Sequence, residues 1–171
     1  MSRPTTNRTA PSFSSLVQSF FTEYLTQQRA LSSQTVAAYR DAFVLFLDFA
    51  VVSLHKQPAT LSLQDITPGL ILDFLAHLER DRGNCVRTRN ARLAALRAFL
   101  KFASHRDVAA LHVIEQALGV PMKRFERPML GYLSREEILA IIGTPGPSWT
   151  SQRDHLLLHV LYNTGARVSE I

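Results

Sequence analysis

Apolar residues recur every three to four positions in five successive stretches of the first 118 residues, and no stretch shows the strict alternation of a β-strand. Ser32 and Thr67 stand where helices would begin, and Pro68 suits a first helical turn. The first part of the chain is therefore predicted to be all-α, a bundle of four or five helices. The predicted helices span residues 12–28, 33–54, 68–83, 85–104 and 108–118.

The composition changes on both sides of this helical region. Residues 1–11 are polar and rich in Pro and Thr, which predicts a disordered arm. Residues 119–131 contain two prolines and two glycines, with Lys123 and Arg124 between them, and this pattern is typical of a basic interdomain linker. The helical domain is therefore expected to occupy residues 12–118.

Residues 132–171 are expected to be the opening part of a second domain. Ser134 and Glu137 fit a capping box at the start of one helix, and Pro and Gly residues at 143–147 separate it from another. Two helices share too little surface to fold well alone. We therefore expect the sequence to stop soon after a larger domain has begun.

Positive charge is concentrated in one stretch of the chain. Residues 80–106 contain eight basic residues and one acidic residue, Asp81, which gives this stretch a net charge of +7 where the whole chain carries +5. The remainder is therefore close to neutral. Such an asymmetry favours an acidic partner, and nucleic acid is the commonest one.

The predicted helix over residues 85–104 has an apolar side and a basic side. Arg87, Arg97 and Lys101 fall on the basic side, and Arg92 lies near the seam between the two. Such a helix can pack on its bundle with one face and place cations along DNA with the other. Arginine–phosphate contacts are charge-assisted and often bidentate, so this face is predicted to bind duplex DNA.

Two polar residues near the start of the same helix, Arg89 and Asn90, are predicted to reach base edges. Lys123 and Arg124 in the linker add to the positive charge. The competing interpretation is an ordinary solvated helix face, but almost no acidic residues compensate the charge. A membrane surface is disfavoured, because the opposite face is needed for the core.

Other function classes find little support in the sequence. The single cysteine, Cys85, cannot form an internal disulfide. His155 and His159 have a metal-capable spacing, but no glutamate follows the first and no third ligand is evident, so neither a metal site nor a cofactor is expected. The N-terminus lacks a signal-peptide pattern, and no apolar stretch is long enough to span a bilayer. We expect a cytoplasmic, nucleoid-associated protein.

Four segments, taken together and in this order, resemble the tyrosine recombinase family of the phage-integrase type. They read LSSQTVAAYR at 31–40, TRNARLAALRAF at 88–99, YLSREE at 132–137 and NTGARVSE at 163–170. The resemblance implies a SAM-like core-binding domain, in which Thr35 and Arg40 of the second helix join the fourth helix in contacting duplex DNA. It also implies that the later residues begin a truncated α+β catalytic domain.

The last of these segments is similar to the one that carries the family's first catalytic arginine. The resemblance assigns that role to Arg167 and a supporting role to Glu170. Enzymes of this family attack a phosphodiester with a tyrosine hydroxyl and need no metal, so protein cations neutralise the phosphate. The planar fork of an arginine matches two phosphate oxygens. The family works as tetramers on DNA, which implies self-association of the complete protein.

The family's remaining catalytic groups, including a His-x-x-Arg pair and the tyrosine nucleophile, would follow Arg167. Tyr24, Tyr39, Tyr132 and Tyr162 all precede it. We therefore expect these 171 residues alone neither to cleave nor to rejoin DNA. Two alternatives remain open: a non-catalytic DNA-binding module that competes with a full recombinase, and a helical protein-interaction domain.

Overall fold

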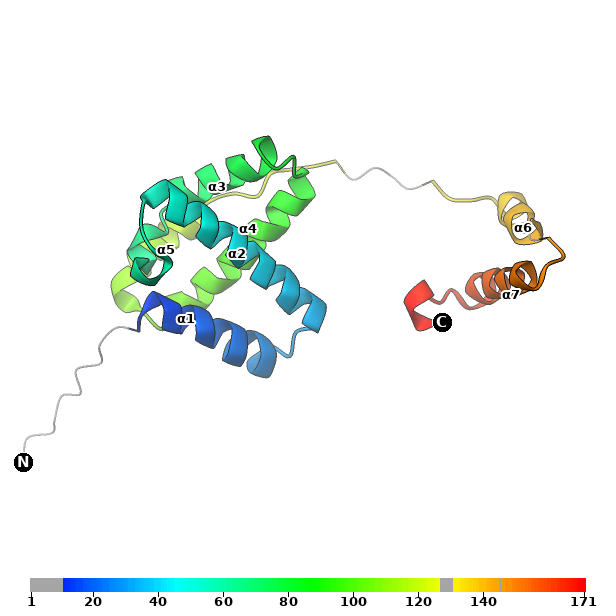
Figure 1. Cartoon of the computed structure of the whole chain (residues 1–171), viewed down its shortest axis with the longest axis horizontal. Coiled ribbons are helices and arrows are strands. Elements are labelled where there is room, and N and C mark those ends of the chain that lie inside the picture. Colours follow the sequence, from blue (N-terminus) through cyan, green and yellow to red (C-terminus); the bar gives the residue numbers. More distant parts are fainter. Residues whose placement is uncertain (1–10, 127–130, 145) are drawn as a thin grey trace, which may run out of the picture. The chain divides into compact units, whose positions relative to one another are not determined.

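The structure is a computed structural model that describes residues 11–126, 131–144 and 146–171. Every regular element in these ranges is helical (Figure 1), which confirms the all-α prediction. The chain divides into two compact units, the first ending at Phe125 and the second beginning at Glu126. The predicted N-terminal arm before Pro11 and residues 127–130 of the predicted linker lie outside the described residues.

The helices of the first unit follow the sequence prediction closely. The end of α3 falls at Arg80, three residues before the predicted end, and the second half of the first predicted helix is a π-helix. The helices of this unit are α1 (Phe13–Ser19) with its π-helical continuation (Phe20–Gln28), α2 (Ser33–Leu54), α3 (Pro68–Arg80), α4 (Val86–Ser104) and α5 (Leu111–Leu118).

Hydroxyl side chains fix where three of these helices begin. Ser12 accepts a hydrogen bond from the backbone N–H of Ser15 at the start of α1. Ser32 and Thr67 do the same for α2 and α3. Each cap satisfies a backbone donor that would otherwise lack a partner in the first helical turn, which explains why the predicted and observed starts agree.

Helix α4 lies at the centre of the first unit, where it contacts α2, α3, α5 and the π-helix. Its buried face presents Leu93, Leu96 and Leu100 to these neighbours. The ring of Phe20 is fully buried and stands at the middle of an aromatic cluster. The rings within 6.5 Å of Phe20, centroid to centroid, are those of Phe21, Tyr24, Tyr39, Phe43, Phe99 and Phe102.

The turn between α3 and α4 depends on Gly83, whose φ of 62° lies in the left-handed region. We expect Gly83→Ala to lower the free energy of unfolding by about 1 kcal/mol, because a Cβ disfavours that conformation even though the space around it is open. Gly69 lies inside α3 in ordinary helical backbone, so Gly69→Ala should instead raise stability by up to about 1 kcal/mol. Urea unfolding of both variants checks this opposite pair of signs.

The first unit continues beyond α5 as an extended segment. The sequence prediction ends the helical domain at residue 118, whereas the compact unit includes the residues up to Phe125. In Figure 1 this yellow segment runs back from α5 past α3 and the start of α4. We call residues 120–125 the strap, because they cross helices that precede them in the sequence by about thirty residues or more.

The second unit contains α6 (Arg135–Gly143) and α7 (Trp149–Thr164). The predicted capping box is present, since Ser134 and Glu137 each accept a hydrogen bond from the other's backbone N–H. Ile142 is the one buried side chain among the residues described in this unit. Large apolar side chains such as Trp149 are exposed, so these residues by themselves enclose no hydrophobic core.

Candidate nucleic-acid interface

The outward face of α4 carries a narrow basic stripe. Ala94, Arg97, Ala98 and Lys101 occupy positions i, i+3, i+4 and i+7 and so share one side of the helix. Lys101 is exposed and Arg97 is half-buried. The buried leucines Leu93, Leu96 and Leu100 lie on the neighbouring side of the helix, so α4 has an apolar side and a basic side, as the sequence predicts.

Residues from two other segments turn this stripe into a pocket. Tyr24 and Arg29 come from the π-helix and the residue that ends it, and Met122 comes from the strap. The pocket has a volume of about 440 Å³. We call it the basic pocket, and its lining residues are Tyr24, Arg29, Ala94, Arg97, Ala98, Lys101 and Met122.

The charge of the basic pocket is uncompensated. Its lining contains three cations and no carboxylate. Among the described residues, no ion pair involves Arg29, Arg97 or Lys101. Three positive charges held around one concavity without acidic partners attract an anion, and the separation of Arg29 from the other two along the chain shows that the fold assembles them.

Tyr24 ties the wall of the basic pocket to the hydrophobic core. Its ring stacks on Phe20 with the centroids 5.8 Å apart and packs against Phe102 at 5.1 Å. The guanidinium of Arg29 lies 5.9 Å from the Tyr24 ring, and its Nη1 is 3.5 Å from the phenolic oxygen. The aromatic contacts therefore orient Tyr24 and, through it, favour a position of Arg29 at the rim.

The start of α4 adds further exposed groups. Arg87 is exposed in the first turn, as the sequence predicts. Cys85 is the N-cap residue and is also exposed. A hydrogen bond with the Thr88 hydroxyl, together with nearby backbone N–H groups, lowers the pKa of the Cys85 thiol. The lowered pKa of Cys85 is consistent with the positive end of the helix dipole, which favours the negatively charged thiolate.

Arg92 lies at the seam of α4 and turns towards α2. Its Nη1 donates a hydrogen bond to the carbonyl oxygen of Ala38 at 3.2 Å, and the residue is half-buried. This contact secures the crossing of α2 over α4. Arg92 does not line the basic pocket.

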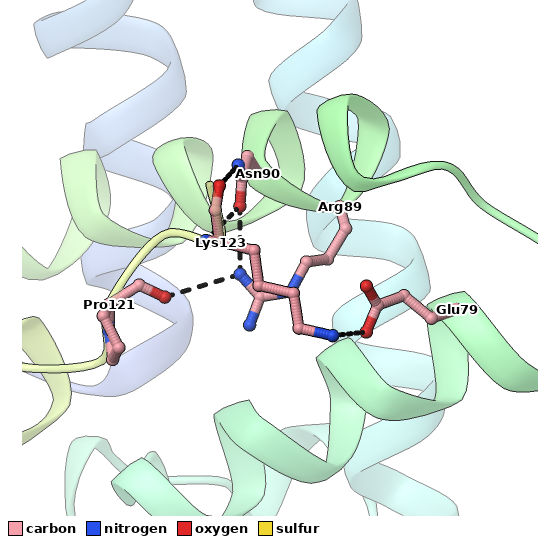
Figure 2. Close-up of polar contacts among 5 residues, drawn as sticks. All are labelled: Glu79, Arg89, Asn90, Pro121 and Lys123. Carbon is pink, nitrogen blue, oxygen red and sulfur yellow. Dashed lines mark hydrogen bonds and ion pairs between the residues drawn. The ribbon is translucent and has the colours of Figure 1, made fainter. Parts of the chain in front are cut away.

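Arg89 and Asn90 are not at the surface. The sequence predicts that they reach base edges, but Arg89 is 4% and Asn90 8% exposed. Figure 2 shows both side chains directed at the strap, where they contact Pro121 and Lys123. The prediction of base contacts is therefore not supported by this geometry, because the strap covers the side of α4 on which Asn90 lies.

The two basic residues of the strap differ in their surroundings. The Lys123 ammonium lies 2.6 Å from a Glu79 carboxylate oxygen, so most of its charge is compensated within the first unit. Arg124 is exposed and forms no ion pair with the described residues. Of these two predicted DNA contacts, Arg124 therefore has the less compensated positive charge.

The two predicted residues of α2 lie apart from the basic pocket. The Thr35 hydroxyl is 2.9 Å from that of Ser32 in the first turn of the helix. Arg40 is exposed, 3.9 Å from Asp41, and borders a different, largely apolar groove of about 690 Å³ between the first helix and α2. Thr35 and Arg40 therefore remain predicted contacts outside the pocket.

The predicted catalytic residues stand at the end of the second unit. Gly165 ends α7 with a φ of 65°, and Arg167 follows as the N-cap of a short 3₁₀ turn. Its guanidinium donates to Glu170 at 3.1 Å, and its backbone N–H donates to the same carboxylate at 2.8 Å. The Arg167 side chain is 82% exposed, so it remains accessible.

Three residues of the basic pocket, Tyr24, Arg29 and Met122, are not predicted from the sequence to belong to a site. Tyr24 shares the apolar spacing of a core residue, which hides its place at a pocket wall. Arg29 is an isolated cation at a helix end, and nothing near it in the sequence marks it. Its significance follows only from the packing of the π-helix on α4, which brings it beside Arg97.

The described residues form neither a cluster of metal-ligating side chains nor a membrane-spanning helix. His155 and His159 pack ring against ring with centroids 4.5 Å apart. Within the described ranges, no group of three or more potential metal-ligating residues forms. None of the helices described is sufficiently long and apolar to cross a bilayer.

Comparison with known proteins identifies relatives of the chain. Residues 19–107 match the family model of the phage integrase N-terminal SAM-like domain. The chain is 40% identical over 161 residues to the integrase/recombinase y4rC of Sinorhizobium fredii, covering 94% of this chain and 48% of that protein.

More distant relatives extend this result. The tyrosine recombinase XerD of Pseudomonas putida is 31% identical over 152 residues, which cover 88% of this chain and 48% of XerD. The chain thus spans about half the length of the curated relatives it matches. No solved structure matches it.

Proposed function

Since the chain belongs to the phage integrase family of tyrosine recombinases, we propose that its first unit binds duplex DNA and that the basic pocket receives the phosphate backbone. One observation carries this proposal: Arg29, Arg97 and Lys101 converge from two helices on one pocket that contains no carboxylate. Arginine and lysine side chains are the usual partners of phosphate oxygens, and such contacts position a protein on DNA.

The exposed cations around the pocket extend this surface. Arg87 at the start of α4 and Arg124 of the strap are exposed, and the predicted contacts Thr35 and Arg40 belong to α2. The net charge of +5 for the whole chain supports attraction to a polyanion. Arg89 and Asn90 do not contribute to this surface, because they are buried.

Salt dependence tests the proposal. We expect the affinity for a short mixed-sequence duplex to fall steeply with salt, with a slope of log K against log salt of about −3 or steeper, because each phosphate contact contributes about −0.9. A gel-shift or fluorescence-anisotropy titration at several salt concentrations measures this slope. Affinity that is independent of salt contradicts phosphate binding, and absence of binding at low salt favours a helical protein-interaction domain instead.

For the complete protein we propose site-specific recombination or integration of DNA. The relatives named integrase/recombinase and tyrosine recombinase support this activity. In it, Arg167 would neutralise charge on the attacked phosphate, and Glu170, which already binds the Arg167 guanidinium, would orient it. Self-association on DNA and location at the nucleoid belong to the same proposal. A DNA-binding module without catalysis remains the alternative for these 171 residues alone.

A further inference from the structure

The side-chain amide of Asn90 attaches the strap to α4, because its donor and acceptor complement those of a backbone peptide unit. The Asn90 Nδ2 donates to the carbonyl oxygen of Lys123 at 2.7 Å, and the Lys123 N–H donates to the Asn90 Oδ1 at 3.1 Å. One side chain therefore satisfies both backbone polar groups of one strap residue, much as a neighbouring β-strand would (Figure 2).

Arg89 reinforces this attachment. Its Nη1 donates to the Asn90 Oδ1 at 3.0 Å and to the carbonyl oxygen of Pro121 at 3.4 Å. Its Nε has no hydrogen-bond partner among the described residues, and no carboxylate forms an ion pair with it there. A buried guanidinium with only neutral partners is expensive to desolvate, so its placement under the strap needs an explanation other than stability.

We propose that Arg89 and Asn90 form a clasp that holds residues 121–123 of the strap on α4 and thereby builds the strap into the DNA-binding surface. Met122 lies between the two clasped residues and lines the basic pocket beside Arg97. Release of the clasp would remove this wall. Asn90 is therefore a positioning residue, which acts on DNA through the strap; this second half of the inference rests on the proposed function.

The clasp also fixes where the first unit ends. The strap belongs to the compact unit up to Phe125, and the hydrogen bonds of Asn90 reach only to Lys123. The Lys123–Glu79 ion pair is largely exposed, and such surface pairs contribute little, so the Asn90 amide is the stronger of the two polar attachments of Lys123. Lys123 is thereby held at a defined point on α3 and α4.

Hydrogen exchange of the 171-residue chain tests the clasp without DNA. In the unsubstituted chain, we expect the Lys123 amide to exchange at least about tenfold more slowly than a free peptide. In Asn90→Ala, its exchange should rise about tenfold or more, while the Val120 amide, which donates to Ala117, changes little. Asn84→Ala is the matched control, because Asn84 precedes α4 and its side chain makes no hydrogen bond to the strap.

Two results would overturn the clasp. One is a Lys123 amide that exchanges freely in the unsubstituted chain, which decides the matter even if Asn90→Ala does not fold. The other is a folded Asn90→Ala chain in which Lys123 exchange is unchanged. Glu79→Gln should change this exchange by less than about twofold, since only the exposed ion pair is lost.

Binding of a short mixed-sequence duplex tests the second half of the inference. Folded Asn90→Ala should bind about fivefold more weakly with an unchanged salt slope, because no cation is removed. If the Lys123 amide is released but affinity stays the same, the strap is no part of the DNA surface. If the unsubstituted chain does not bind DNA while Lys123 is protected, the proposed function fails and the clasp stands.

Discussion

Replacing Arg97 and Lys101 by alanine is expected to weaken DNA binding about sixtyfold at roughly 0.1 M salt. Each phosphate contact with a log–log slope of about −0.9 contributes about eightfold in affinity between roughly 1 M and 0.1 M salt, and two contacts multiply. Both residues line the basic pocket and have no acidic partner among the described residues, so their loss leaves no unpaired carboxylate behind. Fluorescence anisotropy with a labelled duplex measures the change.

The salt slope separates loss of phosphate contacts from loss of folding. In Arg97→Ala/Lys101→Ala, the slope of log K against log salt should become shallower by about 1.8, which is the contribution of two phosphate contacts. The far-ultraviolet circular dichroism spectrum should stay the same. Arg135→Ala/Arg153→Ala removes the same charge from the second unit and is expected to weaken binding far less. Equal losses in the two double variants would mean that net charge, and not the basic pocket, attracts DNA.

Replacing Phe20 by alanine is expected to lower the free energy of unfolding of the first unit by about 3–5 kcal/mol. The ring is fully buried and touches aromatic side chains from the π-helix, α2 and α4, so its removal leaves a cavity where three elements meet. Folded domains of this size have total free energies of unfolding of about 5–15 kcal/mol, so the substitution removes a large share of the stability. Urea unfolding followed by circular dichroism measures the loss.

An exposed apolar residue supplies the control for Phe20. Val52 on α2 is 71% exposed, and Val52→Ala should change stability by less than about 0.5 kcal/mol. A Phe20→Ala chain that unfolds at nearly the same urea concentration as the unsubstituted chain would contradict the central place of this ring. The Trp149 fluorescence does not serve here, because Trp149 belongs to the second unit.

The helices and their starts could be predicted because their determinants are local. Ser32, Thr67 and Ser134 each cap a helix through a backbone group three residues away, so a short window of sequence contains both partners. Apolar spacing likewise identifies the buried face of α4. The π-helical turn of residues 20–28 escaped prediction, because its wider period differs too little from 3.6 over nine residues.

The surroundings of individual polar residues could not be predicted, because they depend on partners far away in the sequence. Asn90 falls on the outward side of a helical wheel, and only the strap, about thirty residues later, covers it. Arg29 joins the basic pocket through the packing of one helix on another. A wheel shows which way a side chain leaves its own helix, but it does not show what crosses that face.

The predicted catalytic residues belong to the second unit, whereas the basic pocket belongs to the first unit. The predicted roles of Arg167 and Glu170 rest on a resemblance over one short segment, and in the second unit both residues interact mainly with each other. The relatives are about twice as long as this chain. DNA binding by the first unit can therefore be measured separately from any strand cleavage.

The exposed thiol at the head of α4 provides a ready attachment point for a reporter. Cys85 is the sole cysteine of the sequence, so a maleimide dye would mark one position without any substitution. Its lowered pKa increases the thiolate fraction near neutral pH, which speeds labelling. Because Arg87 follows two residues later, a fluorophore there would sit at the edge of the proposed DNA surface and could report the arrival of a duplex as a change in emission.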